Sequence, residues 1–86
     1  PFVSAELAAA LRDGGARLLG CDWLLADNPE DPHRPAHVTL LNANVLIVEN
    51  LAQLSQIPAG PFTFHAVPAK IAGAAAFPVR AYAVIS

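Results

Sequence analysis

The chain has 86 residues, of which 55% are apolar and only 14% are charged, and its formal net charge is −2. Soluble domains average roughly a quarter charged residues, and a body of this size buries only about 60–65% of its unfolded surface, so we infer that part of its surface faces more protein. The five Lys and Arg residues form no basic cluster, which argues against a nucleic-acid partner. The single cysteine cannot form an internal disulfide. No 18-residue apolar run occurs, so no transmembrane helix is expected.

The first half of the chain alternates helix and strand patterns. Ser4 is a helix-capping residue and Gly14–Gly15 a helix stop, which together predict a helix with one apolar face between them. The apolar run Ala16–Leu25 is too short for a second helix and predicts a buried strand. Three prolines make Asn28–Pro35 a loop. The next segment, Ala36–Asn42, is long enough for two helical turns.

The second half predicts three strands and one short helical turn. The β-branched, apolar run Val45–Val48 predicts a buried strand that ends at Glu49. Apolar residues at a spacing of three over Leu51–Ile57 predict a short helix or 3₁₀ turn. Phe62–Ile71 and Val79–Ile85 predict two further strands. Strands alternating with helices in this order indicate a mixed α/β domain.

His37 and Glu49 are the first candidates for chemistry. They lie twelve residues apart, at the start of a predicted helix and at the end of a predicted strand. A helix of about seven residues rises roughly 10 Å and a strand of about five residues returns roughly 16 Å, so we expect the two side chains to approach each other. Imidazole and carboxylate together suit zinc or a similar divalent ion. The alternative is a plain helix start and a solvated strand end.

Other polar residues have structural explanations beside functional ones. Asp22 interrupts an apolar run, so it is either hydrogen-bonded or turned outward, and its role stays open. Asp31 and His33 could bind a metal, but their proline-rich setting favours a plain turn. Cys21 is predicted to be a small buried residue, because no adjacent His or Lys activates it. For His65, inside a predicted strand, we favour a structural role.

Three segments of the chain, in one order, resemble the motifs of one enzyme family. Residues 15–22, Gly-Ala-Arg-Leu-Leu-Gly-Cys-Asp, are similar to its Gly-x-x-x-x-Gly-x-Asp segment. Residues 35–51 contain Pro-Ala-His, Leu-Leu and Val-Leu-Ile-Val-Glu-Asn-Leu, and are similar to its Pro-x-His…Leu-Leu…Ile-x-Glu-Asn-Leu segment. Residues 62–81 contain Phe-Thr-Phe, Val-Pro-Ala-Lys-Ile and Pro-Val-Arg-Ala, which resemble its closing strands. The family that the chain resembles is the cyclase family, which includes bacterial kynurenine formamidase.

The resemblance implies the C-terminal part of a swivelling β/β/α fold in a zinc- or manganese-dependent hydrolase. It also implies that His37 and Glu49 bind the metal. The family's remaining ligands and its catalytic histidine lie in an upstream His-x-Gly-Thr-His-x-Asp-x-Pro-x-His motif, which this sequence does not contain, so we expect no catalytic residue within it. Val38 is a second departure, since an arginine often follows the ligand histidine in the family.

Two functions are compatible with these features. In the first, residues 1–86 are a single domain or fragment of a hydrolase that cleaves an amide, cyclic amide, ester or lactone bond of a small molecule, and are inactive alone. In the second, the chain is a non-catalytic fragment or subunit that acts by association. Both predict contact with a missing N-terminal part or another subunit, most simply in a homo-oligomer. A single cysteine and the lack of a signal-peptide pattern predict a cytoplasmic location. The aromatic residues that we expect at an interface are Trp23, Phe62, Phe64 and Phe77.

Overall fold

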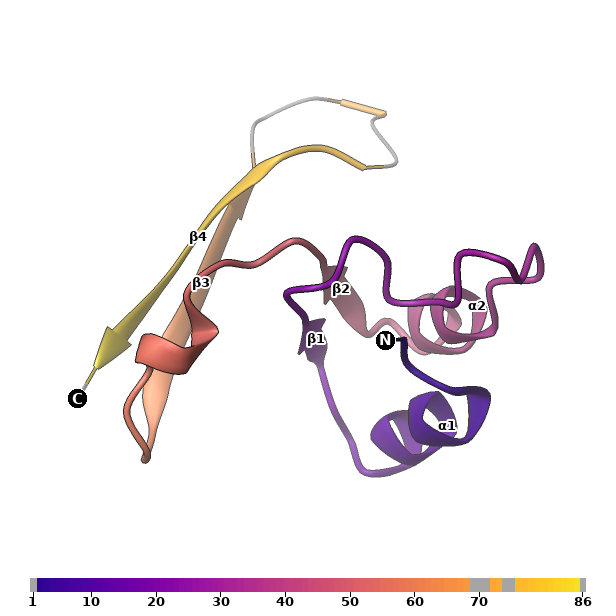
Figure 1. Ribbon diagram of the computed structural model, residues 1–86, viewed down its shortest axis with the longest axis horizontal. Helices are drawn as coiled ribbons and strands as arrows, with labels where there is room; N and C mark the ends of the chain where they lie inside the picture. Colours follow the sequence, from indigo (N-terminus) through magenta and orange to yellow (C-terminus); the bar gives the residue numbers. More distant parts are fainter. Residues whose placement is uncertain (1, 69–71, 74–75, 86) are drawn as a thin grey trace. The chain divides into compact units, whose positions relative to one another are not determined.

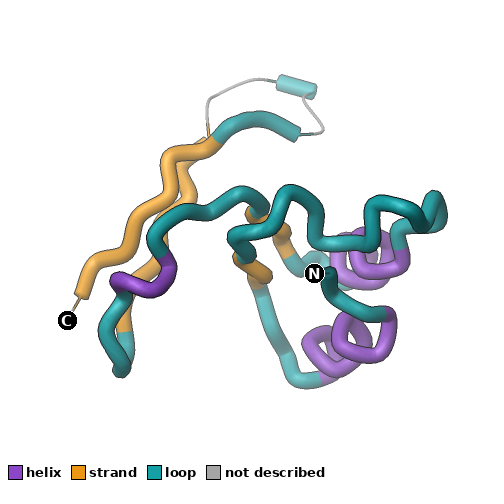
Figure 2. Tube along the Cα trace, viewed as in Figure 1, coloured by secondary structure: helices purple, strands orange, loops and turns teal. Residues whose placement is uncertain are grey.

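The computed structural model describes residues 2–68, 72–73 and 76–85, and the chain forms two compact units, Pro1–Ala52 and Gln53–Ser86. The mixed α/β class is confirmed, with short helices and small sheets, whereas a single domain over residues 1–86 stays a prediction. The elements of the first unit are α1 (Ala5–Asp13), β1 (Leu18–Gly20), α2 (Pro35–Asn42) and β2 (Leu46–Val48), and those of the second are the 3₁₀ helix η1 (Leu54–Gln56), β3 (Phe62–Pro68) and β4 (Val79–Ile85) (Figure 1, Figure 2).

Helix α1 begins and ends where its sequence predicts. The Ser4 hydroxyl accepts a hydrogen bond from the Leu7 amide at 3.1 Å, which satisfies one of the amides that a helix start leaves free. Glu6 lies in the first turn, where a negative charge is favourable. At the other end Gly14 is the cap and Gly15 adopts a φ of +82°, a conformation that costs glycine little.

Strands β1 and β2 form a parallel two-stranded sheet. Leu18 pairs with Leu46 and Gly20 pairs with Val48. A parallel pair needs a crossover connection, and the segment between the two strands supplies it with α2, which packs against α1 (Figure 1). The order strand, helix, strand therefore brings the start of α2 and the end of β2 into one small unit.

The strand predicted over Ala16–Leu25 is wrong in length, because β1 ends at Gly20. The Cys21 amide still donates to the Val48 carbonyl at 2.9 Å. On the partner segment, however, Asn50 adopts a φ of 59°. This left-handed conformation interrupts the extended backbone that a regular ladder needs, although the Asn50 and Leu51 amides still donate to the Trp23 and Cys21 carbonyls, each at 3.0 Å.

The prediction that both strands are buried is also wrong. Leu18 is 36% exposed and Leu46 is 62% exposed. Side chains alternate between the two faces of a sheet, and Leu19 and Ile47 use the face that packs on the core. On the opposite face Leu18 and Leu46 are exposed, while the Leu51 side chain lies against Gly20.

The core of the first unit is small and lies between the two helices and one face of the sheet. Ala36 and Leu40, one turn apart on α2, are both fully buried, so this helix face points inward. The next face carries His37 and the half-exposed Leu41 toward the surface. The buried cluster is Val3, Ala8, Ala36, Leu40 and Val45, with Leu11, Leu19, Trp23 and Ile47 packed against it.

The second unit is an antiparallel hairpin with two different faces. Pairing runs from Phe62 opposite Ile85 to Pro68 opposite Val79; the predicted strand Phe62–Ile71 extends beyond this into residues 69–71, which lie outside the described residues. On one face every residue is apolar. On the other, His65 stacks on Tyr82 with ring centroids 4.7 Å apart and an angle of 11° between the rings, a structural contact of the kind expected for His65. The residues of the apolar face are Phe62, Phe64, Ala66, Pro68, Val79, Ala81, Ala83 and Ile85.

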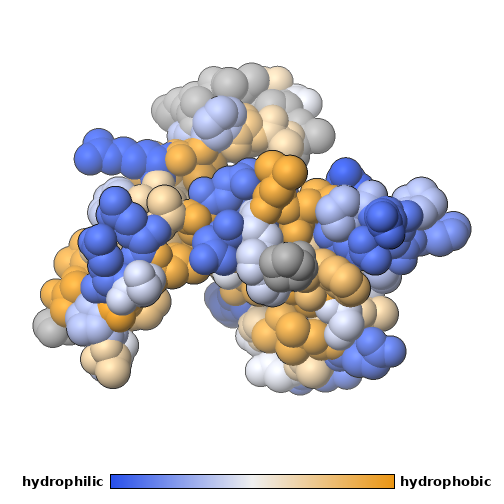
Figure 3. Space-filling view, in the orientation of Figure 1, coloured by the Kyte–Doolittle hydropathy of each residue, from blue (hydrophilic) through white to orange (hydrophobic). Residues whose placement is uncertain are grey.

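Large apolar side chains reach the surface in both units (Figure 3). Leu24 is 80% exposed in the first unit, and Ile85 is 50% exposed in the second. Of the aromatic residues expected at an interface, Phe62 is exposed, and Trp23, Phe64 and Phe77 are half-buried. The interface itself stays a prediction. None of the helices in the described residues is long and apolar enough to cross a membrane.

Candidate functional site

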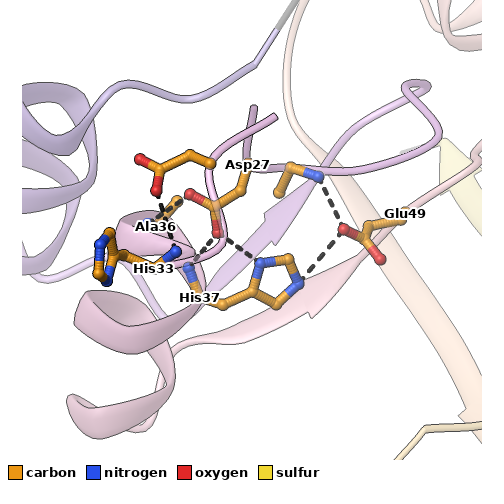
Figure 4. A network of polar contacts seen from close by, with 7 residues as sticks. Asp27, His33, Ala36, His37 and Glu49 are labelled. Atoms are coloured by element: carbon orange, nitrogen blue, oxygen red, sulfur yellow. Dashed lines mark hydrogen bonds and ion pairs between the residues drawn. The ribbon is translucent and has the colours of Figure 1, made fainter. Parts of the chain in front are cut away.

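His37 and Glu49 meet as their spacing predicts. His37 lies in the first turn of α2, and Glu49 directly follows β2. His37 Nε2 and Glu49 Oε2 are 3.4 Å apart, and the two side chains are 18% and 25% exposed (Figure 4). The expected approach of the two side chains is therefore confirmed, and both remain partly accessible to solvent.

Asp27 completes this arrangement and was not among the residues predicted from the sequence. Its side chain is fully buried. Asp27 Oδ1 accepts a hydrogen bond from the Ala36 amide at 2.7 Å. Asp27 Oδ2 accepts one from the His37 amide at 2.8 Å and lies 2.6 Å from His37 Nδ1 (Figure 4). One carboxylate thus holds both the backbone and the ring of His37.

The protonation of this group follows from its contacts. Burial alone would raise the pKa of Asp27, but hydrogen bonds from the His37 amide, the His37 ring and the Ala36 amide outweigh burial and lower that pKa below its ordinary value. An ionised carboxylate can only accept hydrogen bonds, so the ring proton of His37 lies on Nδ1. In the neutral ring Nε2 then carries a lone pair, and this lone pair faces Glu49.

Glu49 is also held in place by the backbone. Its Oε2 accepts a hydrogen bond from the Ala26 amide at 2.7 Å, and the Ala26 carbonyl accepts one from the Val3 amide at 2.6 Å. Ala26 and Asp27 are both fully buried. Two consecutive residues therefore position the pair, the first through its amide on Glu49 and the second through its carboxylate on His37.

An open hollow of about 450 Å³ lies beside His37. It runs along the loop that precedes α2 and along the outer face of the helix. His37 is one of its lining residues, so a small molecule in the hollow would lie next to this residue. The lining residues are Pro32, His33, Arg34, His37, Val38, Leu41 and Asn42.

The other candidates do not join the pair. Asp22 is exposed in a bend after β1, outward-facing but not in a strand. Asp31 Oδ1 accepts a hydrogen bond from the His33 amide at 2.9 Å, which is the plain turn favoured for these two residues. Cys21 is buried as predicted, and burial raises the pKa of its thiol. Among residues 2–68, 72–73 and 76–85, no three His, Cys, Asp or Glu side chains are grouped so that they could hold a metal ion.

A sequence signal for Asp27 exists, although it is weak. Helix α2 starts at Pro35, and the preceding Arg34 is not a capping residue type. The first free amides of the helix therefore need an acceptor from elsewhere in the chain. Asp27 is the acid that directly follows the apolar segment 24–26, where burial is expected.

Comparison with known proteins reveals close relatives, although no family model matches the chain. The kynurenine formamidase of Salinibacter ruber is 39% identical over 79 residues, that of Bacillus cytotoxicus 35% over 81 residues, and that of Sphingopyxis alaskensis 34% over 79 residues. These matches cover 92%, 94% and 92% of this chain. The chain is homologous to the kynurenine formamidases. The resemblance seen in its motifs is thereby confirmed.

The fold of this chain also matches a solved structure described as "The Structure Of Potential Metal-Dependent Hydrolase With Cyclase Activity". The TM-score is 0.82 at 36% identity, over 93% of this chain. The cyclase-like fold implied by the resemblance is therefore confirmed. The chain spans 37% and 38% of the length of the first two kynurenine formamidases and 39% of that hydrolase.

Proposed function

We propose that His37 and Glu49 contribute two ligands to a divalent metal site, zinc or manganese, of a hydrolase that cleaves an amide, cyclic amide, ester or lactone bond. The observation that carries this proposal is the pair of acceptor atoms, His37 Nε2 and Glu49 Oε2, that face each other 3.4 Å apart. The names of the kynurenine formamidase relatives and of the metal-dependent structural neighbour support the same class of reaction.

The residues present fit such an ion. Two acceptors that face each other repel unless a positive charge lies between them. Zinc ligands lie about 2.0–2.2 Å from the ion, so two tetrahedral ligands are roughly 3.3 Å apart, close to the observed 3.4 Å. A neutral imidazole nitrogen and a carboxylate oxygen are both accepted donors for zinc and manganese. A second proton on the ring would relieve the same repulsion, so metal binding has to be measured directly.

The ligand set within this chain is short of a full site. A catalytic zinc usually has three protein ligands, and among the described residues no third His, Cys, Asp or Glu is grouped with the pair so that it could hold a metal ion. Asp27 contacts His37 at Nδ1, not at the Nε2 atom that faces Glu49. We propose that the remaining ligands come from outside this chain, either from an N-terminal part of the same protein or from another subunit, with a homo-oligomer as the simplest form. The chain alone would then bind metal weakly and lack hydrolase activity.

Each residue of the site has a separate part in this chemistry. A divalent ion lowers the pKa of water toward neutrality and polarises a carbonyl group, which is what amide and ester hydrolysis require. Glu49 supplies negative charge and is oriented by the Ala26 amide. His37 supplies a neutral nitrogen donor. The hollow beside His37 would admit a small-molecule substrate to this side of the pair.

The test compares two matched substitutions in the whole protein that contains this chain. Glu49→Gln keeps an oxygen acceptor for the Ala26 amide but removes the ligand charge. Affinity for zinc or manganese should fall at least ~10-fold, and turnover of N-formylkynurenine, the substrate to which the relatives' name points, should be lost. Glu30→Gln removes a carboxylate from an exposed loop position and should change neither quantity.

Unchanged metal affinity in Glu49→Gln would contradict the proposed ligand role. The non-catalytic alternative, in which the chain acts by association, predicts a different pattern. The whole protein would then show no metal-dependent turnover of any formamide, cyclic amide or lactone, while still forming a stable assembly through this chain.

A further inference from the structure

Helix α2 begins without a cap of its own. The residue at its N-cap position, Arg34, has a left-handed backbone with φ 46° and ψ 60° and makes no side-chain cap hydrogen bond. The first helical residue, Pro35, has no amide hydrogen. The first amides in need of an acceptor are therefore those of Ala36 and His37.

Asp27 supplies both acceptors from a distant part of the chain. It precedes Ala36 by nine residues and His37 by ten, and its two oxygens accept one amide each, at 2.7 and 2.8 Å. Its carboxylate therefore acts as a remote helix cap. The oxygen that accepts the His37 amide also lies 2.6 Å from His37 Nδ1, so the cap and the contact to the ring share one atom.

We propose that Asp27 is a positioning residue that ties the start of helix α2 to the tautomer of His37, so that the Nε2 lone pair is presented to Glu49. The part of this inference that concerns the metal rests on the proposed function. The part that concerns the His37 ring does not rest on it, because the contacts of Asp27 with the His37 amide and ring involve no metal. Asp27 itself is fully buried and has hydrogen-bond partners on both oxygens, so its role is to orient His37 and not to touch a substrate.

The substitution Asp27→Asn tests how far the tautomer of His37 depends on an acceptor at this position. Asparagine has nearly the same shape as aspartate, but one of its two polar side-chain atoms donates hydrogen bonds. In one orientation this donor faces the Ala36 amide, and in the other it faces the amide and ring of His37. Facing a donor, the His37 ring is expected to move its proton from Nδ1 to Nε2. The lone pair that faces Glu49 would then be lost.

The first experiment reads the tautomer without any metal. Nitrogen-15 spectra of the ring nitrogens are recorded for the metal-free protein at a pH where His37 is neutral, and the His37 signals are assigned by their loss in His37→Gln. The wild type should carry its proton on Nδ1, and Asp27→Asn should shift the population to Nε2. The matched control is Asp31→Asn, which removes the same charge from a turn carboxylate that accepts only the His33 amide; it should leave the tautomer unchanged.

The second experiment titrates the same proteins with zinc. Asp27→Asn should bind zinc about 10–100-fold more weakly than the wild type, and Asp31→Asn should bind it as the wild type does. Leu40→Ala, a core substitution on the same helix, controls for loss of stability and should retain the wild-type tautomer.

These measurements can overturn the inference independently of the metal. A proton on Nε2 in the wild type would overturn it. So would an unchanged tautomer in Asp27→Asn when contacts of the side-chain NH2 group in the proton spectra place that group at the His37 ring. The wild-type spectrum decides the matter even if Asp27→Asn does not fold. A wild-type protein without zinc affinity would refute the proposed function, but the tautomer experiment would still support or overturn the positioning role. Zinc affinity undiminished in a folded Asp27→Asn would refute the link to metal binding.

Discussion

The two units of the chain place their polar and apolar residues differently. The first buries an apolar cluster and, in the loop that precedes α2, a carboxylate with partners on both oxygens. The second is a hairpin in which none of the described residues is fully buried. A packed core holds side chains in single positions, whereas an isolated two-stranded hairpin is marginally stable at best. A preorganised polar site is therefore possible in the first unit, and we expect the hairpin to gain stability from a further surface.

The largest effect should come from the core of the first unit. Leu40 is fully buried, while its neighbour Leu41 is 50% exposed. Leu40→Ala should lower the free energy of unfolding by about 2–5 kcal/mol, through lost burial and a residual cavity. Leu41→Ala should change it by only about 0.5 kcal/mol. Urea denaturation measures both. If Ile85→Ala in the hairpin cost as much as Leu40→Ala, the contrast between the units would be wrong.

A smaller effect should distinguish the remote cap from the local one. Asp27→Ala leaves the fully buried Ala36 amide without its acceptor, which costs about 1–3 kcal/mol for a buried donor. Ser4→Ala removes the exposed cap of α1, typically worth about 1 kcal/mol. Thermal or urea unfolding should thus rank Asp27→Ala below Ser4→Ala in stability. The reverse order would show that the buried cap is less important than its geometry indicates.

The smallest effect is expected in the hairpin. Tyr82 stacks on His65 across the strand pair, and the Arg80 guanidinium lies 5.7 Å from the Tyr82 ring centroid. Because Tyr82 is 42% exposed, Tyr82→Ala should cost only about 0.2–1 kcal/mol, the range of a cross-strand pair. Thr63→Ala on the same face serves as the control. If Tyr82→Ala also destabilised the first unit, measured as lost protection of the α2 amides in hydrogen exchange, the contrast between the two units would be wrong.

Local signals in the sequence were sufficient for the two α-helices and the last strand. Ser4 and Gly14 delimit α1, and the range predicted for α2 differs from the observed one by a single residue, Pro35. Strand β4 matches its predicted range. These features depend on capping groups, glycine conformations and side-chain alternation within a few residues, all of which are visible in a short window of sequence.

Burial and strand length were the weaker predictions. The apolar run 16–25 was expected to form one buried strand, yet β1 ends at Gly20, and Leu18 and Leu46 are exposed on one face of the small sheet. Hydrophobicity indicates that a segment prefers to be covered, but not which neighbour covers it. The left-handed Asn50 on the partner segment ended the ladder, and no pattern within residues 16–25 records that.

The sequence by itself indicated the pair His37 and Glu49, through the return geometry of the helix and strand between them together with the resemblance to the cyclase family. Only the tertiary structure decided what holds the pair. Asp27 lies outside the segment that joins the two residues. It reaches His37 because Ala26, its neighbour in sequence, is held by hydrogen bonds to Glu49 and Val3, while Asp27 itself accepts a hydrogen bond from the start of α2. A hydrogen bond between distant segments depends on the final packing of both, so a local sequence pattern cannot specify it.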